Sequence, residues 1–376
     1  MSSKIKIFVA LDTITSKNLG CQLVSAQIRK IMSNSPEVGE VYYSKGFTYS
    51  LCPADKAKLK ESDVVYVNGE GACGMIMTPL IKDILDTAIH HKKPIYFCNF
   101  TLDLRTRESI FVDEGCLYSW LNYFHLCEVV SVRDPISYYF LKEHGLDKVL
   151  LFPDIGTYHS PEENIKAEKE SRQVMFSLGS IIKQIKPGLE KDKFLIGFQK
   201  IVNEISREYE VVIPDWPSSP VSDANFLSSI KNVKIIKPDY KEYFLECSKS
   251  IFNITGRHHG TVMSYSAGCP FLTFSSNMWK TEGDNFLYNS SPFLNIGDLR
   301  NNPKEWIDII KDELLKTGER KLFLEKRKEV LKKYHAANVE IIWKDIPQMD
   351  ISFLETDKIK AWLKSNYKLT NLVKKY

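Results

Sequence analysis

The sequence predicts an α/β protein made of two similar halves, each a parallel β-sheet covered by helices, followed by further helices. The chain has 376 residues, more than one hydrophobic core usually holds, so two domains of about 150–180 residues are expected. Strand-like and helix-like segments alternate in the first half, and the alternation starts again in the second. A polar, charged stretch at residues 159–172 separates the two series. Repeated alternation of this kind is typical of parallel sheets with helices on both faces.

The first half is predicted to be a domain covering residues 1–160. Its helices are expected at residues 19–32, 75–91, 118–126 and 136–144. Its strands, which are short apolar runs bounded by polar or turn residues, are expected at residues 5–11, 41–43, 63–68, 94–100, 129–132 and 149–152.

The second half is predicted to be a similar domain covering residues 161–345. Strands are expected at residues 174–178, 210–213, 233–236, 251–255 and 271–274. Helices are expected at residues 193–209, 239–248, 260–267, 304–315 and 320–334. A last helix at 353–367 belongs to a C-terminal segment, residues 346–376, which we expect to pack back on the first domain.

The composition indicates an ordinary folded protein. Hydrophobic residues make up 43% of the chain and aromatic residues 12%. The formal net charge of +4 is small and evenly spread, so no nucleic-acid partner is expected. The eight cysteines show neither a CxxC pair nor metal-ligand spacing. We therefore expect reduced, buried thiols, no metal site and no cofactor.

The sequence also predicts a cytoplasmic protein. A strand-like segment begins near the N-terminus, where a signal peptide would lie, and no apolar run is long enough to cross a membrane. Lysines recur near the C-terminus, at positions 358, 360, 364, 368, 374 and 375. A solvated helix face is the favoured explanation for them, and peripheral contact with an anionic membrane is the most they would otherwise support.

The most informative motif is the segment Gly256-Arg257-His258-His259-Gly260, which follows a predicted buried strand and precedes a helix. An arginine and a histidine at the carboxyl end of a parallel strand, beside a helix N-terminus, suit a carboxylate or phosphate ligand. Adjacent side chains point in different directions, so at most one of the two histidines is expected to face the ligand. Lys280 and Glu282 follow the next strand, where Lys280 would complete a cationic pocket and Glu282 would hold the lysine or a sugar hydroxyl.

Two glycine-containing turns in the first half are weaker candidates. Asn68-Gly69-Glu70-Gly71 follows a strand and precedes a helix, but it lacks both the GxGxxG dinucleotide pattern and the Walker GK[ST] ending. Ligand contact and a plain tight turn with Glu70 exposed or capping are equally consistent with it. Asn18-Leu19-Gly20 opens the first predicted helix, and both Asn and Gly are ordinary turn residues.

Arg133 lies between a predicted strand and a helix start. Asp134 before Pro135 has the features of an N-cap followed by proline at the first helical position. Arg133 has no such local explanation: either it pairs with Asp134 or Asp154, or it contacts a ligand. The spacing slightly favours the structural pair.

Taken in order, these segments resemble the polysaccharide pyruvyltransferase family. The corresponding motifs are Asn18-Leu19-Gly20, the turn at 68–71, Ser131-Val132-Arg133-Asp134, Pro153-Asp154, Arg257-His258-His259-Gly260, Ala267-Gly268-Cys269-Pro270 and Lys280-Thr281-Glu282. They cover roughly residues 15–285. The sequence departs from the family pattern at two places. Gly20 is followed by Cys21 and Gln22 instead of the family's Asp, and Glu70 interrupts the glycine turn.

The resemblance implies two Rossmann-like domains in a GT-B-like arrangement, with the active site between the facing carboxyl edges of the two sheets. It implies transfer of pyruvate from phosphoenolpyruvate to a glycan sugar as a cyclic ketal. His259, at the family's HG position, and Arg257 would be catalytic, and Arg257, Lys280, Glu282 and Arg133 would bind the donor. The first domain would be the acceptor side, with Asn18, Asn68 and Glu70 contacting a saccharide, including a lipid-linked one.

Two other functions remain open at this stage. A GT-B glycosyltransferase would use the same arginine and lysine to bind the diphosphate of a nucleotide sugar, with Glu70 or Asp154 as base. A non-enzymatic protein that binds a surface polymer is the weakest alternative. It would have no need for an Arg, His, Lys and Glu set on neighbouring loops.

Overall fold

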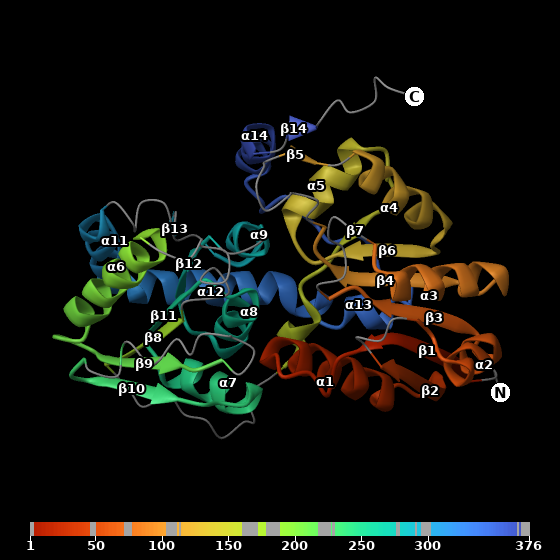
Figure 1. Cartoon of the computed structure of the whole chain (residues 1–376), viewed down its shortest axis with the longest axis horizontal. Coiled ribbons are helices and arrows are strands. Elements are labelled where there is room, and N and C mark those ends of the chain that lie inside the picture. The colour runs from red at the N-terminus through yellow and green to blue at the C-terminus, as the bar shows by residue number, and fades with distance from the viewer. Residues whose placement is uncertain are drawn as a thin grey trace. The chain divides into compact units, whose positions relative to one another are not determined.

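Two six-stranded parallel sheets form the framework of the protein (Figure 1). The computed structural model describes residues 4–45, 50–70, 77–102, 111–112, 114–159, 172–177, 189–216, 227, 230–275, 279–289, 292–294, 302–366 and 368–369. Contacts divide the chain into two compact units. Unit 1 comprises Met1–Thr15, Val24–Ile155 and Lys333–Tyr376, and unit 2 comprises Ser16–Leu23 and Gly156–Lys332. The α/β fold class predicted from the sequence is thereby confirmed.

The sheet of unit 1 has the strand order β2-β1-β3-β4-β6-β7. This is the order of flavodoxin-like sheets. The chain first adds β2 on one side of β1 and then adds the later strands on the other side, so the strand order reverses between β1 and β3. The central strands are continuous apolar runs, for example VVYVN in β3 with all five residues buried, as parallel strands covered on both faces require. The strands are β1 (Ile5–Asp12), β2 (Val38–Lys45), β3 (Val64–Asn68), β4 (Ile95–Phe100), β6 (Val129–Val132) and β7 (Leu150–Leu151).

The helices between these strands begin at recognisable caps. At α5, the Asp134 carboxylate accepts hydrogen bonds from the Ser137 amide at 2.8 Å and hydroxyl at 2.7 Å, and Pro135 occupies the first turn. This is the cap that the sequence predicts. The helices are α1 (Leu19–Asn34), α2 (Pro53–Glu61), α3 (Pro79–His90), α4 (Glu114–Leu126) and α5 (Pro135–Glu143). A short parallel pair, β5 (Phe111–Val112) with β14 (Lys368–Leu369), also forms in this unit.

The last part of the chain packs on unit 1. It contains η3 (Lys332–Tyr334), α13 (Ala337–Glu340) and α14 (Thr356–Asn366). Asn338 anchors it: its amide accepts from Ser131 Oγ and donates to the Pro153 carbonyl, both at 2.7 Å. The Tyr139 and Thr356 hydroxyls form another hydrogen bond at 2.8 Å.

The sheet of unit 2 has the order β10-β9-β8-β11-β12-β13. Numbered within the unit, this is 3-2-1-4-5-6, the order of the Rossmann fold, with the reversal between β8 and β11. The strands are β8 (Gln173–Ser177), β9 (Glu210–Pro214), β10 (Val233–Ile236), β11 (Phe252–Thr255), β12 (Phe271–Phe274) and β13 (Phe293–Leu294). The helices are η1 (Ile155–Tyr158), α6 (Leu189–Ile205), α7 (Tyr240–Lys249), α8 (His258–Ala267), α9 (Lys280–Tyr288), α11 (Pro303–Leu315) and α12 (Thr317–Leu331).

Each face of this sheet has its own apolar cluster. On one face, alternate strand residues such as Val174 and Phe176 pack with α6 and α11, including Trp306. On the other face, Met175 and Val212 pack with α7, α8 and Trp216, and Leu19 and Leu23 of α1 join this cluster. The first residues of α1 therefore complete the core of unit 2.

Several predicted boundaries were wrong. Helix α8 begins at His258 rather than at residue 260, so both histidines lie in its first turn. Helix α3 begins at Pro79, where Thr78 accepts a hydrogen bond from the Ile81 amide. Helices α2 and α9 were not predicted at all. Gly71, Leu178, Tyr367 and most of the predicted linker lie outside the described residues.

No helix within the described part of the chain combines the length and the apolar composition that crossing a bilayer requires.

Candidate active site

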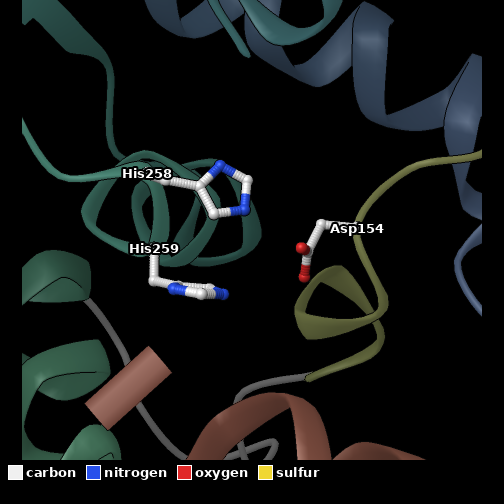
Figure 2. A group of neighbouring side chains, drawn as sticks. All are labelled: Asp154, His258 and His259. Carbon is white, nitrogen blue, oxygen red and sulfur yellow. The ribbon is translucent and has the colours of Figure 1, made fainter. Parts of the chain in front are cut away.

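The strongest cluster of functional side chains lies in unit 2, where the strand order of the sheet reverses. Ligands of open α/β sheets bind outside the carboxyl ends of the strands at such a reversal. Strand β11 ends at Thr255, and Gly256 and Arg257 connect it to α8. Figure 2 shows His258 and His259 projecting from the first turn of α8. The predicted motif therefore occupies the position where this fold binds ligands.

The two glycines of the motif allow α8 to lie close to the sheet. A Cβ at Gly256 would be 2.3 Å from Cε2 of Phe274, and one at Gly260 would be 2.5 Å from Thr255 Oγ1 and 2.9 Å from the Tyr243 hydroxyl. Real Cβ atoms essentially never come this close to other atoms, so neither position has room for a side chain. The glycines set the distance between helix and sheet, and the residues between them supply the chemistry.

Arg257 is half-buried and stacks on an indole. Its Cζ lies 4.4 Å from the centroid of the Trp216 ring. Trp216 is 1% exposed and is itself fixed by a hydrogen bond from its Nε1 to Ser177 Oγ at 3.1 Å. The Arg257 amide donates to Thr255 Oγ1 at 3.1 Å. Stacking on an aromatic face restricts the guanidinium to one plane, which suits bidentate recognition of an anion.

His258 and His259 are both nearly buried, with 8% and 7% exposure, and their rings meet edge to face at 4.5 Å between centroids. Their surroundings differ. His258 Nδ1 lies 2.7 Å from Oδ2 of the fully buried Asp284. His259 packs against Gly20, where an added Cβ would be 1.9 Å from His259 Nδ1. The two neighbours are thus held by different partners.

Lys280 and Glu282 lie in the first turn of α9, the helix that carries Asp284, and both are half-buried. Glu282 Oε2 accepts a hydrogen bond from the Thr281 hydroxyl at 3.2 Å. Helix α9 packs against α8, and ring contact between Tyr265 and Tyr288, 4.6 Å apart, joins them. The predicted Lys–Glu pair is therefore on an element adjacent to the histidine-bearing helix.

Asn18 caps helix α1. Its Oδ1 accepts a hydrogen bond from the Gly20 backbone N–H at 3.0 Å, and the backbone N–H of Asn18 donates to Ser16 Oγ at 3.1 Å. This is the side-chain role that favours Asn before a helix. The segment Ser16–Leu23 belongs to unit 2, so Asn18 lies in the same unit as Arg257 and His259, and its neighbour Gly20 contacts His259.

In unit 1, Asn68 lies at the corresponding reversal of strand order, where β3 ends beside β1. It is 1% exposed, its Nδ2 donates to the Leu11 carbonyl at 3.4 Å, and its Oδ1 accepts from the Glu70 amide at 3.3 Å. A Cβ at Gly69 would be 2.5 Å from the Phe100 Cβ. Asn68 therefore holds the ends of β1 and β3 together, and Glu70 is half-buried in the turn that follows.

Arg133 is fully buried and paired. Its Nη1 donates to Oδ2 of Asp154 at 2.6 Å, both side chains are 0% exposed, and its Nε donates to Thr101 Oγ1 at 3.3 Å. Asp154 lies on the segment that leads into η1 (Figure 2). The structure shows the pair with Asp154, one of the partners that the sequence left open.

Burial removes two other groups near α8 from consideration as bases or nucleophiles. It raises the pKa of the Tyr243 hydroxyl well above its usual value and the pKa of the Cys247 thiol to about 12. Both groups stay protonated at neutral pH. Imidazoles, carboxylates and the Lys280 ammonium are then the candidate proton carriers in the described part of this site.

Trp216 and Asp284 are the site residues that sequence reasoning missed. Trp216 lies far from Arg257 in the sequence and meets it only because β9 and β11 belong to one sheet. Asp284 is four positions after Lys280, so a predicted helix there would have placed it one turn from the Lys280–Glu282 motif. The sequence did not predict that helix, so it did not place the Asp284 carboxylate near this motif.

The chain is built from two Rossmann-like units, as proteins of the GT-B class are. A family described as polysaccharide pyruvyl transferase matches residues 17–278. The chain belongs to this family, and the family predicted from the sequence motifs is confirmed. The match includes Asn18, Arg257 and His259 and ends just before Lys280. A search of curated proteins found no match.

Solved structures with the same fold include UDP-GlcNAc 2-epimerases and a glycotransferase. UDP-GlcNAc 2-epimerase from Neisseria meningitidis, bound to UDP-GlcNAc, superposes with a TM-score of 0.56 at 15% identity, covering 90% of this chain and 98% of that one. MnaA of S. aureus, solved with UDP, gives 0.57 at 13% identity, covering 93% and 100%. The glycotransferase of kitacinnamycin gives 0.56 at 13% identity, covering 92% and 100%. At these identities the likeness shows the fold alone.

Proposed function

We propose that the protein transfers the pyruvate unit of phosphoenolpyruvate to two hydroxyls of one glycan sugar, forming a cyclic ketal and releasing phosphate. The observation that carries the proposal is Arg257, stacked on Trp216 at the N-terminus of α8 and adjacent to two histidines in sequence. The planar cation and the helix N-terminus suit the two anionic groups of a small donor. The histidines, as proton carriers, suit its acid-sensitive double bond.

Arg257 and Lys280 bind the donor in this proposal. Phosphoenolpyruvate carries a carboxylate and a phosphate, and a guanidinium recognises either in bidentate fashion, while an ammonium acts as a point charge. The amides of the first turn of α8 add partial positive charge. Glu282 orients Lys280 or a sugar hydroxyl. Arg133 acts as a brace in this proposal, because its buried pair with Asp154 fixes the end of β6.

His259 transfers protons during the reaction. The first sugar oxygen bonds to the central carbon of the donor while the methylene carbon gains a proton and becomes a methyl group. The second sugar oxygen then forms the other C–O bond, and phosphate leaves with the electron pair of the bond that breaks. Two hydroxyl protons are lost, one balances the new C–H bond, and the other leaves with the phosphate. An imidazole is suited to such transfers near neutral pH.

The acceptor is a saccharide, free or lipid-linked, and we assign Asn18, Asn68 and Glu70 to its side. Asn68 and Asn18 order the backbone turns at which a sugar would bind, and Glu70 offers a carboxylate to hydroxyls. We propose the cytoplasm as the place of this reaction.

A thermal-shift panel tests the donor. Phosphoenolpyruvate at 100 times its Kd should stabilise the protein by about 2.7 kcal/mol, which raises the melting temperature by roughly 5–10 °C for units of this size. Nucleotide sugars should give no comparable shift. The opposite pattern, a shift with a nucleotide sugar and none with phosphoenolpyruvate, contradicts the proposal and favours the alternative, a glycosyltransferase.

Arg257→Ala tests the residue that carries the proposal. We expect it to abolish both the phosphoenolpyruvate shift and transfer while the circular dichroism spectrum is unchanged. Arg207→Ala is the matched control, because Arg207 is an exposed arginine of the same unit that pairs with Glu204 at 2.6 Å. Full activity of Arg257→Ala would remove this arginine from the site.

A further inference from the structure

The contact between His258 and Asp284 has the geometry of a histidine–carboxylate dyad. His258 Nδ1 and Asp284 Oδ2 are 2.7 Å apart, the side chain of His258 is 7% exposed, and that of Asp284 is fully buried. The two residues come from the first turn of α8 and from the middle of α9. Neither belongs to the Arg–Lys pair that we assign to the donor.

With Asp284 ionised, this contact sets the tautomer of the His258 imidazole. An ionised carboxylate can only accept hydrogen bonds, so the Nδ1 of His258 carries the proton that is donated to Asp284. In the neutral ring the other nitrogen, Nε2, then has a lone pair and can accept a proton. The buried carboxylate also stabilises the imidazolium that forms when it does so, as in other histidine–carboxylate pairs.

The proposed reaction needs two proton carriers at one moment. When the first sugar hydroxyl adds to the double bond, that hydroxyl loses a proton while the methylene carbon gains one. A single imidazole cannot accept one proton and donate another at the same instant. The two rings, 4.5 Å apart between centroids, supply one group for each direction.

We propose that His258, oriented by Asp284, is the general base that removes the proton from the attacking sugar hydroxyl, and that His259 donates the proton to the methylene carbon. This inference rests on the proposed function. His258 Nε2 takes the hydroxyl proton as the C–O bond forms, and the π electrons of the double bond take the proton of His259 as the C–H bond forms. Asp284 is a positioning residue, since it acts through His258.

Asp284→Asn is the decisive variant. The amide can donate to Nδ1, which would move the ring proton to Nε2 and abolish the base without a change in side-chain size. We expect kcat to fall about 10²–10⁴-fold, with the KM for phosphoenolpyruvate within about twofold of the wild type and an unchanged melting curve. Asp284→Glu should restore part of kcat. Asp308→Asn, an exposed aspartate of α11 in the same unit, is the matched control and should keep full activity.

Nitrogen-15 NMR of histidine-labelled protein, with His258→Gln to assign the signal, reads the tautomer independently of activity. Wild-type His258 should be protonated at Nδ1, and Asp284→Asn should move the proton to Nε2. An Nε2–H tautomer in the wild type, or an Asp284→Asn variant that keeps its kcat, overturns the inference while the proposed function stands. Absence of phosphate release from phosphoenolpyruvate by the wild type overturns the proposed function and the base assignment with it, and the NMR signal still decides whether Asp284 sets the tautomer.

Discussion

The two sheets reverse their strand order at comparable places, yet the polar residues there are held in different ways. In unit 1, Asn68 bonds to backbone on both sides of the reversal, and Arg133 forms a buried ion pair with Asp154. In unit 2, Arg257 stacks on the ring of Trp216, and His258 contacts the carboxylate of Asp284. The bonds of unit 1 join chain segments to one another, whereas those of unit 2 orient side chains.

This difference suggests that the two arginines of the family motifs have different roles, one in stability and one in ligand binding. A buried arginine whose partner is also fully buried mainly fixes the backbone around it. A half-buried arginine that stacks on an indole has a fixed guanidinium orientation, but it contributes little to the stability of the fold. We therefore propose that Arg133 acts mainly in stability and Arg257 in ligand binding; the prediction from the sequence that both bind the donor stays untested.

The largest expected effect is on stability, from Arg133→Met. Removing one partner of a buried pair leaves Asp154 as an uncompensated buried charge, and we expect the free energy of unfolding to fall by about 3–5 kcal/mol. The double variant Arg133→Met/Asp154→Leu should recover most of this loss because neither charge remains. Urea denaturation measures both. An Arg133→Met protein of wild-type stability that no longer binds phosphoenolpyruvate would contradict the structural role, because Arg133 would then be a ligand-binding residue.

The second-largest expected effect is on catalytic activity, from Gly20→Ala. The added Cβ would be 1.9 Å from His259 Nδ1, so the imidazole must move, and a displacement of about 1 Å costs roughly 10²-fold in rate. Steady-state kinetics of phosphate release measures the change. Gly318→Ala is the control, since a Cβ there has nothing within 4 Å, and it should leave kcat unchanged. A fully active Gly20→Ala variant would show that the position of His259 is not critical.

Much of the fold could be predicted because local signals agreed with it. The apolar run of β3 and the Asp134–Pro135 cap of α5 each specify their element without help from distant residues. Helix α9 could not be predicted in this way. Gly283 and Asn285 are poor helix formers, and the element is stabilised by tertiary packing of buried residues such as Leu287 and Tyr288. Likewise, α8 starts at two histidines that carry no capping signal.

The candidate site was predictable only where its residues are adjacent in sequence. Arg257 and His259 lie within one motif, so their chemistry is visible in the sequence. Trp216 and Asp284 act through contacts that the fold creates, one across the sheet and one between neighbouring helices. Gly20 is a similar case: its turn was visible, but its contact with His259 depends on the start of α1 packing into the core of unit 2.

The smallest expected effect comes from Trp216→Phe, which tests whether stacking on Trp216 orients Arg257 for ligand binding. Phenylalanine keeps an aromatic face but loses the indole hydrogen bond to Ser177 and part of the attraction for the guanidinium, which together should weaken phosphoenolpyruvate binding by about 0.5–1 kcal/mol, or roughly two- to fivefold. Trp306→Phe is the control, because Trp306 is also 1% exposed and packs on the opposite face of the same sheet. It should lose comparable stability and no affinity, as thermal-shift titrations of both variants would show. Equal losses of affinity would mean that Trp216 acts through the stability of the unit, and the orientation of Arg257 would then need another cause.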